Sequence, residues 1–246
     1  MSKKRMIRNT VRELLFLSAI LFLYPPQGNA QDFPFQPEYE IEESGFRSVF
    51  NGLDLTGWSY DPVYWSVRDG VMVGEVTPET ILKQNSFIIW TESLPADFEF
   101  KAEFRVSDRG NSGINYRSDR VENQYALRGY QLDIDGRNKY TGMMYEERAR
   151  QILAHRGDLT ICADGRKIVT ASVGEPDELA PEPGEWHEAH VMAYGHTLIH
   201  LIDGRVTSVV VDTDVEHRRA QGYIGMQVHV GPPMTIEFRN IRLKEY

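Results

Sequence analysis

The chain has 246 residues, of which 36 are Asp or Glu and 27 are Lys or Arg, so its formal net charge at pH 7 is −9. This acidity argues against nucleic acid or an anionic membrane surface as a partner, because both are bound through clustered basic side chains. Cys162 is the only cysteine, so an intrachain disulfide is excluded and stability must come from the hydrophobic core.

The first 30 residues have the pattern of a secretory signal peptide. Basic residues near the N-terminus precede an apolar run from Leu14 to Tyr24, and Gly28-Asn29-Ala30 supplies the small residues typical of a cleavage site. The run is short for a membrane span, and an uncleaved N-terminal anchor is the alternative. We therefore expect an exported protein, periplasmic or secreted, without membrane insertion after cleavage. Residues 31–44 are polar and indicate an extended lead-in.

From residue 45 onward, the apolar segments are short, rich in β-branched and aromatic residues, and bounded by turn residues. Asp69-Gly70, Asp164-Gly165 and Asp203-Gly204 predict tight hairpins, because Asp-Gly readily adopts the positive φ that such turns need. One short helix is expected, at 145–154. Strands are expected at 46–50, 64–67, 71–76, 87–91, 98–106, 112–117, 128–135, 159–162, 166–173, 186–194, 197–202, 206–211, 222–230 and 235–243.

Roughly a dozen strands without alternating helices predict an all-β sandwich of two antiparallel sheets, with 45–246 as a single domain. The polar face of each strand should then point away from the core. If the strands that begin near Phe98, Ser112, Arg128 and Gly222 share a sheet, one outer face gathers many hydrogen-bonding groups. These groups would be Glu103, Arg105, Asn115, Arg117, Gln131, Asp133, Gln227 and His229.

The stretch 128–150 is the best candidate for the floor and wall of a binding cleft. Its first strand alternates apolar side chains with Gln131, Asp133 and Asp135. A second apolar run then ends in the charged segment 146–150. The purely structural interpretation is a solvated helical turn with internal salt bridges. Because the charges close an apolar run, we favour a binding role.

Several motifs occur in an order that resembles the 3-keto-disaccharide hydrolase domain family. The resemblance covers Phe46 to Tyr246. It implies a concanavalin A-like jelly roll of the lectin/glucanase type, with sugar bound on the concave sheet and action on glycosides oxidised at C3. The motifs are Phe50-Asn51-Gly52-Leu53-Asp54-Leu55-Thr56-Gly57-Trp58, Trp65 with Asp69-Gly70, Gly110-Asn111-Ser112-Gly113-Ile114, Gly129-Tyr130-Gln131, Gly184-Glu185-Trp186, Asp203-Gly204 and Phe238-Arg239-Asn240-Ile241.

One motif departs from the commoner family pattern. Many members have Gly-Tyr-Glu-x-Gln where this chain has Gly129-Tyr130-Gln131-Leu132-Asp133, so a carboxylate and an amide are exchanged. The chain is similar to a branch of the family that has Gly-Tyr-Gln and a Tyr-Asp/Glu-Glu run, here Tyr145-Glu146-Glu147.

A ketone at C3 of a sugar acidifies the hydrogen on C2. A base can then remove that hydrogen if the enolate is stabilised, the C1 substituent leaves, and water adds back. We predict Asp133 or Glu147 as the base and Arg117 or Arg148 as the cation beside the enolate. His229 is the predicted proton donor, because imidazole titrates near neutral pH. Predicted substrate-binding residues are Gln131, Asn115, Glu146, Arg148, Arg150, Gln227 and Glu103.

Other functions remain open at this point. A direct glycosidase could pair Glu146 or Glu147 with Asp133. A divalent metal held by Asp133, Glu146 or His229 is possible, although no compact ligand motif predicts one and no cofactor is expected. The main alternative to an enzyme is a non-catalytic carbohydrate-binding module of the same fold. A structural or adaptor protein of the envelope is a third hypothesis, suggested by the acidic loop 174–185.

Overall fold

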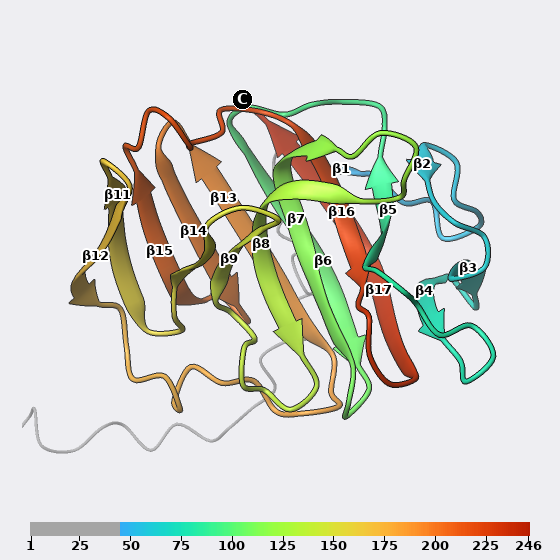
Figure 1. The fold of residues 1–246 in the computed structure, drawn as a ribbon. Coiled ribbons are helices and arrows are strands. Elements are labelled where there is room, and N and C mark those ends of the chain that lie inside the picture. Colours follow the sequence, from blue (N-terminus) through green and yellow to red (C-terminus); the bar gives the residue numbers. More distant parts are fainter. Residues whose placement is uncertain (1–44) are drawn as a thin grey trace, which may run out of the picture. The chain divides into compact units, whose positions relative to one another are not determined.

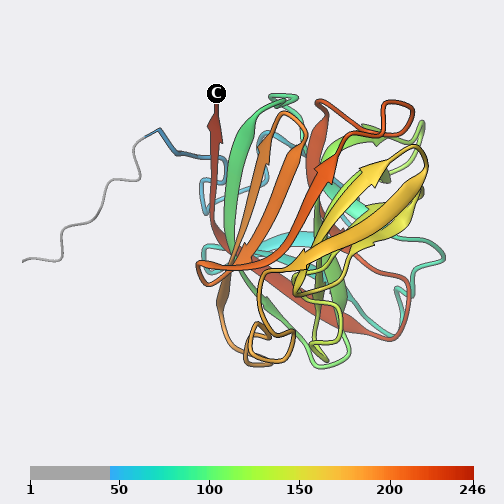
Figure 2. The same cartoon turned by 90° about the vertical axis from the view of Figure 1, so that its left-hand side faces the viewer.

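The computed structural model describes residues 45–246, which form seventeen strands in two sheets packed face to face (Figure 1). Figure 2 shows the two layers from the side. The predicted all-β sandwich is confirmed. The predicted signal peptide and lead-in, residues 1–30 and 31–44, lie outside the described residues.

The larger sheet has ten strands, and neighbouring strands in it are antiparallel except for the parallel pair β11 and β15. Its central strands carry long aromatic side chains toward the other sheet. The order across the sheet is β12 (Arg166–Ser172), β11 (Asp158–Ala163), β15 (Arg205–Asp212), β14 (Thr197–Ile202), β13 (His187–Tyr194), β6 (Phe98–Val106), β17 (Met234–Glu245), β4 (Val71–Val76) and β3 (Trp65–Arg68), with β1 (Arg47–Ser48) paired to β17.

The smaller sheet has seven strands and carries the polar outer face that matters for function. The order is β10 (Gln151–Ala154), β9 (Met144–Glu147), β8 (Leu127–Asp135), β7 (Asn111–Arg120), β16 (Tyr223–Val228), β5 (Ser86–Trp90) and β2 (Trp58–Ser59). Three of the four strands expected to share a sheet do so: β7, β8 and β16.

Two predictions about the fold are wrong. The strand 98–106 is β6 of the larger sheet, paired with β13 and β17, so its polar side chains face the opposite side of the molecule. The segment 145–154 is the β9–β10 hairpin rather than a helix. Its apolar residues pack as alternating strand positions, and pairing with β8 supplies hydrogen bonds that an isolated short helix would lack.

The core lies between the two sheets and follows from the alternation of each strand. Phe98, Phe100 and Phe104 project from β6, and Leu132 and Ile134 project from β8 to meet them. His200 of β14 is buried among these side chains. It accepts a hydrogen bond from the Tyr116 hydroxyl (2.9 Å) and donates one to the carbonyl of Met143 (3.2 Å), which ties the β8–β9 loop to the larger sheet. Burial lowers the pKa of His200 to about 3, so the ring is neutral.

Part of the outer face of the smaller sheet is covered by the loop between β7 and β8. Ala126 and Leu127 pack on Phe87 and Ile89 of β5 and form a second, small apolar cluster. Gly225 of β16 leaves room for this loop, since a Cβ there would lie 2.7 Å from Cδ1 of Leu127. The rest of this outer face, over β8, β9 and β10, is not covered by the loop.

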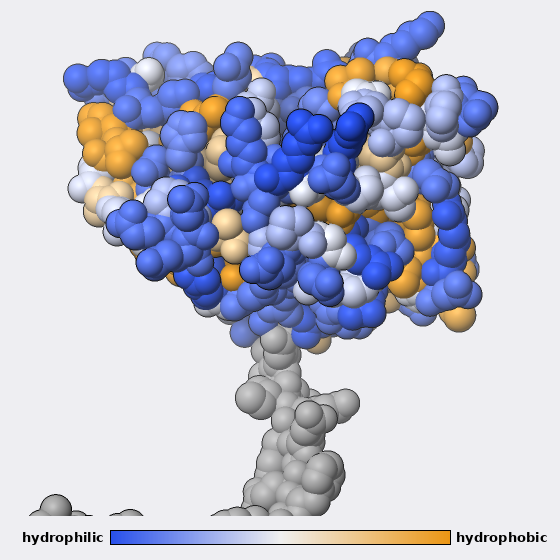
Figure 3. Space-filling view, turned by 90° about the horizontal axis from the view of Figure 1, so that it is seen from below, coloured by the Kyte–Doolittle hydropathy of each residue, from blue (hydrophilic) through white to orange (hydrophobic). Residues whose placement is uncertain are grey.

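No helix within residues 45–246 is long and apolar enough to cross a membrane. Viewed from below, the surface is mostly hydrophilic, with separate apolar patches near its margins (Figure 3).

Candidate active site

A cavity of about 490 Å³ lies on the open half of the smaller sheet. Its floor comes from β8 and β9, and its walls come from the β8–β9 loop, from β10, from the first residue of β7 and from residues next to β5 and β16. The lining residues are Asn85, Asn111, Gln131, Asp133, Tyr140, Met143, Tyr145, Glu147, Arg148, Ile152 and His229.

Alternation along β8 aims Gln131 and Asp133 at the cavity, while their neighbours enter the core. The amide of Gln131 donates a hydrogen bond to Oδ1 of Asp133 (2.5 Å) and accepts one from Nε2 of Gln227 (3.3 Å). Gly113, opposite Asp133 on β7, makes this arrangement possible. A Cβ there would lie 2.6 Å from three atoms of the Gln131 side chain. The orientation of Asp133 is therefore set by neighbouring strands.

On β9, Tyr145 and Glu147 face the same cavity. Asn85 Nδ2 donates to Oε1 of Glu147 (3.3 Å), and Nε of Arg148 lies 4.0 Å from the same oxygen. Arg148 has a left-handed φ of 57°, uncommon for a residue with a side chain. Such conformations persist where the surrounding structure holds them, and they gather at functional sites.

Both cavity carboxyls have a raised pKa. Burial raises the pKa of Asp133 to about 7; the hydrogen bond from Gln131 opposes the shift, and the charges of Glu147 and Asp135 add to it. Burial also raises the pKa of Glu147, against the hydrogen bond from Asn85 and the positive charges of Arg148 and His229. The two groups therefore differ in how well their surroundings support the ionised form.

His229 follows β16 and lines the cavity on the side of Asn85. Its Nδ1 lies 2.6 Å from the carbonyl oxygen of Val230, which can only accept a hydrogen bond, so the proton sits on Nδ1. When the ring is neutral, its lone pair is therefore on Nε2.

Five of the predicted site residues meet in this cavity: Gln131, Asp133, Glu147, Arg148 and His229. Asn115 and Gln227 lie beside Gln131 on the same face, fully buried, but they do not line the cavity. Alternation along β9 would also have indicated Tyr145. Asn85, Asn111, Tyr140, Met143 and Ile152 come from loops and strand ends, where no sequence pattern indicated a role.

The prediction that Arg117 stands beside the reacting sugar is wrong. A register shift after Tyr116 and a φ of 43° at Arg117 turn this side chain off the outer face. Its guanidinium donates to the carbonyls of Ala96 (2.8 Å) and Gly195 (2.8 Å) and to Oδ1 of Asp97 (3.1 Å). Arg117 thus joins loops at one end of the sandwich.

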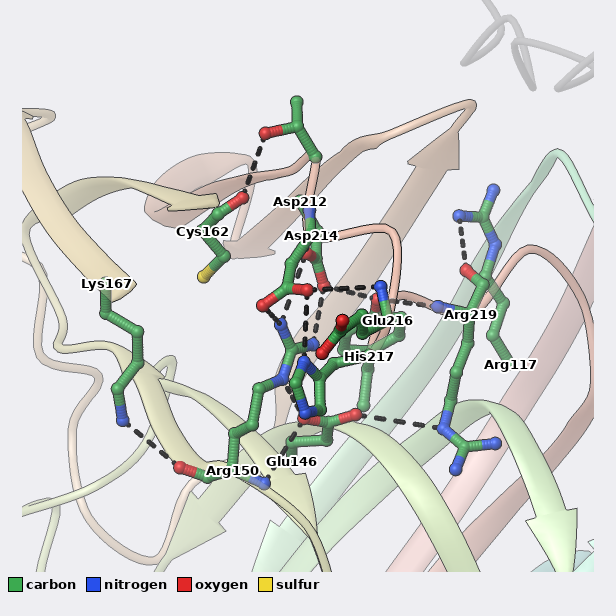
Figure 4. A network of polar contacts seen from close by, with 12 residues as sticks. Arg117, Glu146, Arg150, Cys162, Lys167, Asp212, Asp214, Glu216, His217 and Arg219 are labelled. Atoms are coloured by element: carbon green, nitrogen blue, oxygen red, sulfur yellow. Dashed lines mark hydrogen bonds and ion pairs between the residues drawn. The ribbon is translucent and has the colours of Figure 1, made fainter. Parts of the chain in front are cut away.

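Glu146 and Arg150 are also displaced from their predicted place, because they point between the sheets (Figure 4). Nε of Arg150 donates to Oε2 of Glu146 (2.5 Å), and its Nη2 donates to Oδ2 of Asp212 (2.6 Å). The Tyr130 hydroxyl donates to the same oxygen of Asp212 (2.6 Å), and Arg219 lies 3.7 Å from Glu146. This inter-sheet ion network connects β9 to β15 of the larger sheet.

The predicted substrate contact at Glu103 is wrong as well. Glu103 lies on β6 of the larger sheet, on the outer side, and accepts hydrogen bonds from Nε of Arg239 (2.6 Å) and from the amide of Asn240. It is a cross-strand ion pair on the far face of the sandwich. Among residues 45–246, no group of three or more His, Cys, Asp and Glu side chains is placed to hold a metal ion.

Residues 45–244 match the family of 3-keto-alpha-glucoside-1,2-lyase-like domains. The chain is also 25% identical over 173 residues to the 3-keto-disaccharide hydrolase of Bacteroides thetaiotaomicron. That match covers 65% of this chain and 56% of the relative, so it spans little more than half of the relative's length.

Solved structures with the same fold include a glycosyl hydrolase and a carbohydrate-binding module. A chain described as a glycosyl hydrolase from Parabacteroides distasonis has a TM-score of 0.56 at 19% identity, covering 82% of this chain and 94% of that one. A carbohydrate-binding module from Bacillus subtilis has a TM-score of 0.53 at 17% identity, covering 77% and 96%. A Bacillus subtilis protein of unknown function with a galectin-like fold has a TM-score of 0.54 at 11% identity, covering 78% and 90%. At these identities the likeness concerns the fold, a jelly-roll sandwich.

Proposed function

This chain belongs to the 3-keto-alpha-glucoside-1,2-lyase-like domain family, and we propose that it is a carbohydrate-active enzyme that cleaves 3-keto glycosides, 3-keto-disaccharides in particular. One observation carries the proposal. Asp133 and Glu147, two buried carboxyls with raised pKa, share a cavity with the cation Arg148. The substrate named for the Bacteroides thetaiotaomicron relative supports the substrate class.

The surroundings of the two carboxyls assign their roles, since a pair whose pKa values are pushed apart supplies both an acid and a base. Asp133, with a pKa of about 7, is still protonated in a large fraction of molecules near neutral pH and acts as the acid. Glu147 has Asn85, Arg148 and His229 to support its charge and acts as the base. The donor role predicted for His229 thus passes to Asp133, and His229 assists by keeping Glu147 ionised.

The reaction proceeds by elimination and addition. Glu147 takes the proton from C2, and the electron pair of that C–H bond forms an enolate whose negative oxygen at C3 is stabilised by Arg148. The enolate collapses, the C1–O bond breaks, and Asp133 protonates the departing oxygen. Water then adds to the enone, with OH at C1 and H at C2. The sum is hydrolysis of the glycoside.

The first test measures sugar release. Purified protein incubated with a 3-keto-disaccharide should release free sugar, which chromatography detects. Asp133→Asn and Glu147→Gln should each abolish most of the release. Glu103→Gln, a carboxylate on the far face, is the matched control and should keep it. Binding of the disaccharide without release by the parent protein would contradict the proposal and favour a carbohydrate-binding module.

The second test separates elimination from direct displacement by two carboxylates. In D₂O, elimination followed by addition places deuterium on C2 of the released sugar, whereas displacement leaves that C–H bond intact. Mass spectrometry of the product distinguishes the two. Cleavage of the unoxidised disaccharide at a similar rate would also contradict elimination, since without the ketone the hydrogen on C2 is not acidic.

Export is a separate proposal, supported by the basic and apolar pattern of residues 1–30. N-terminal sequencing of the protein recovered from outside the cytoplasm should begin at Gln31. Recovery of the uncleaved chain from a membrane fraction would contradict it.

A further inference from the structure

A second cavity, of about 350 Å³, adjoins the first. The two share one lining residue, Asn85, which stands at the boundary between them. The walls of the second cavity come from three segments: Asp61 and Tyr64, residues 81–86, and residues 123–125 of the β7–β8 loop.

Asn85 is fixed by contacts on both sides. Its Nδ2 donates to Oε1 of Glu147 (3.3 Å), and its Oδ1 accepts a hydrogen bond from the main-chain N–H of Val230 (3.0 Å). The second cavity therefore begins one side chain away from the carboxylate that takes the C2 proton.

The second cavity has the side chains that a sugar ring needs. Tyr125 is 39% exposed and Ile81 is 47% exposed, and Tyr64 is half-buried beside them. Aromatic and aliphatic surfaces pack against the C–H face of a pyranose, and the side-chain amides of Gln84 and Gln124 can bond to its hydroxyls.

The loop that carries Tyr125 is held in place by the sheet. The carbonyl of Tyr125 accepts a hydrogen bond from the main-chain N–H of Phe87 (2.8 Å), and the next residues, Ala126 and Leu127, are buried on β5. The backbone of Tyr125 is thus held in place by the sheet. Its side chain forms part of the cavity wall and is not buried in the core.

We propose that the second cavity is the subsite for the leaving group, and that it binds a second pyranose ring attached to C1 of the 3-keto ring. The inference rests on the proposed function. C1 is bonded to C2, the carbon that faces Glu147, so its substituent starts close to Asn85, where the second cavity opens. Binding energy from this ring would help to position C2 and the C1–O bond, so it should raise kcat/KM.

The experiment compares two substrates that differ only in the leaving group: a 3-keto-disaccharide and the corresponding methyl 3-keto-glucoside. Tyr125→Ala and Ile81→Ser should each lower kcat/KM for the disaccharide about tenfold, while kcat/KM for the methyl glycoside stays within about twofold. Val63→Ser, at a 58% exposed apolar residue outside the cavity wall, is the matched control and should change neither. Thermal unfolding of each variant checks that the fold is intact.

Each outcome decides the matter. Selective loss on the disaccharide supports the subsite. Equal loss on both substrates, or no loss on either, overturns the subsite while sugar release by the parent protein leaves the proposed function standing. Failure of the parent protein to cleave either substrate overturns both.

Discussion

Glu146 and Glu147 are neighbours on β9, yet they have opposite surroundings. Glu146 points between the sheets, where Arg150 and Arg219 lie close to its carboxylate. Glu147 points into the cavity, where its closest cation, Arg148, is 4.0 Å away and has a side chain that is 35% exposed. A buried carboxylate with close cations therefore supports the fold, whereas one with few cations nearby is available for chemistry.

The same contrast appears in the pKa values. Burial alone would lower the pKa of Arg150, but its hydrogen bonds to Asp212 and Glu146 raise it, so the inter-sheet ion network stays charged. In the cavity, the effect of burial exceeds that of the hydrogen bond from Gln131, and the pKa of Asp133 rises to about 7. Mutations in the cavity should therefore reduce activity, and mutations in the inter-sheet ion network should reduce stability.

The largest expected effect is on activity. Asp133→Asn or Glu147→Gln should lower kcat/KM about 10²- to 10⁴-fold, the range expected when a general acid or base is lost. Steady-state kinetics measure this, and thermal unfolding should show a folded protein. For Glu146→Gln we expect a large loss of stability and a small loss of kcat/KM. If Glu146→Gln leaves the protein folded but lowers activity as much as Glu147→Gln, the distinction between the two glutamates is wrong.

The next effect is on stability. Arg150→Met removes the bidentate partner of Asp212 and the side-chain donor to Glu146, so the free energy of unfolding should fall by about 3–5 kcal/mol. Urea unfolding measures this. Arg68→Met is the control, because Arg68 pairs with Glu75 on the exposed surface and should contribute less than about 1 kcal/mol. Equal losses in the two variants would contradict a structural role for the network.

A third effect depends on pH. Because folding raises the pKa of Asp133 from 3.8 to about 7, the folded chain holds more protons than the unfolded chain within that window. Stability therefore falls as pH rises from about 4 to about 7, by up to about 4 kcal/mol from this group. Asp133→Asn removes this titration. Its free energy of unfolding, relative to the parent protein, should increase by about that amount between pH 4 and pH 8.

The pH dependence of activity follows from the same assignment. The reaction needs protonated Asp133, so kcat/KM should decline above about pH 7, and it needs ionised Glu147, so kcat/KM should also decline at acidic pH. A rate that keeps rising through pH 7 to 9 would show that the reaction does not need a proton on Asp133, and would contradict its role as the acid.

The smallest expected effect concerns how Gln131 sets the pKa of Asp133. Gln131→Met removes the hydrogen bond that favours the ionised form of Asp133, so the pKa of Asp133 should rise further. The alkaline limb of the pH–rate profile should then move upward, by about one unit, with a loss in kcat of about tenfold from poorer positioning. The direction of the shift separates this residue from a merely structural one.

Much of the fold could be predicted from local patterns. Alternation gave the bounds of 98–106 and 197–202 as the structure has them, and the Asp-Gly turns lie where the dipeptides are, with φ of 50° at Asp69 and 49° at Asp203. The alternation along 128–135 also predicted that Gln131 and Asp133 share the polar face of their strand, and both line the cavity. These features depend on neighbours in sequence.

The errors arose where partners are distant in sequence. Strand 98–106 belongs to the larger sheet because it pairs with β13 and β17. Arg150 and Glu146 are held between the sheets by the distant residues Asp212 and Arg219. Arg117 is turned by a bulge toward carbonyls of other loops. Asn85 reaches Glu147 from a loop 62 residues away. A period of two along one strand carries no information about such partners.

The neighbouring positions of Glu146 and Glu147 also limit what insertions and deletions this hairpin can accept. Removing one residue early in β9 would send the carboxylate of Glu146 into the cavity and that of Glu147 between the sheets, which would separate the charges from their partners on both faces. A substitution disturbs one face, but a change of length disturbs both. Natural variation in the segment Met144–Glu147 should therefore consist of exchanges of residue and not of gaps.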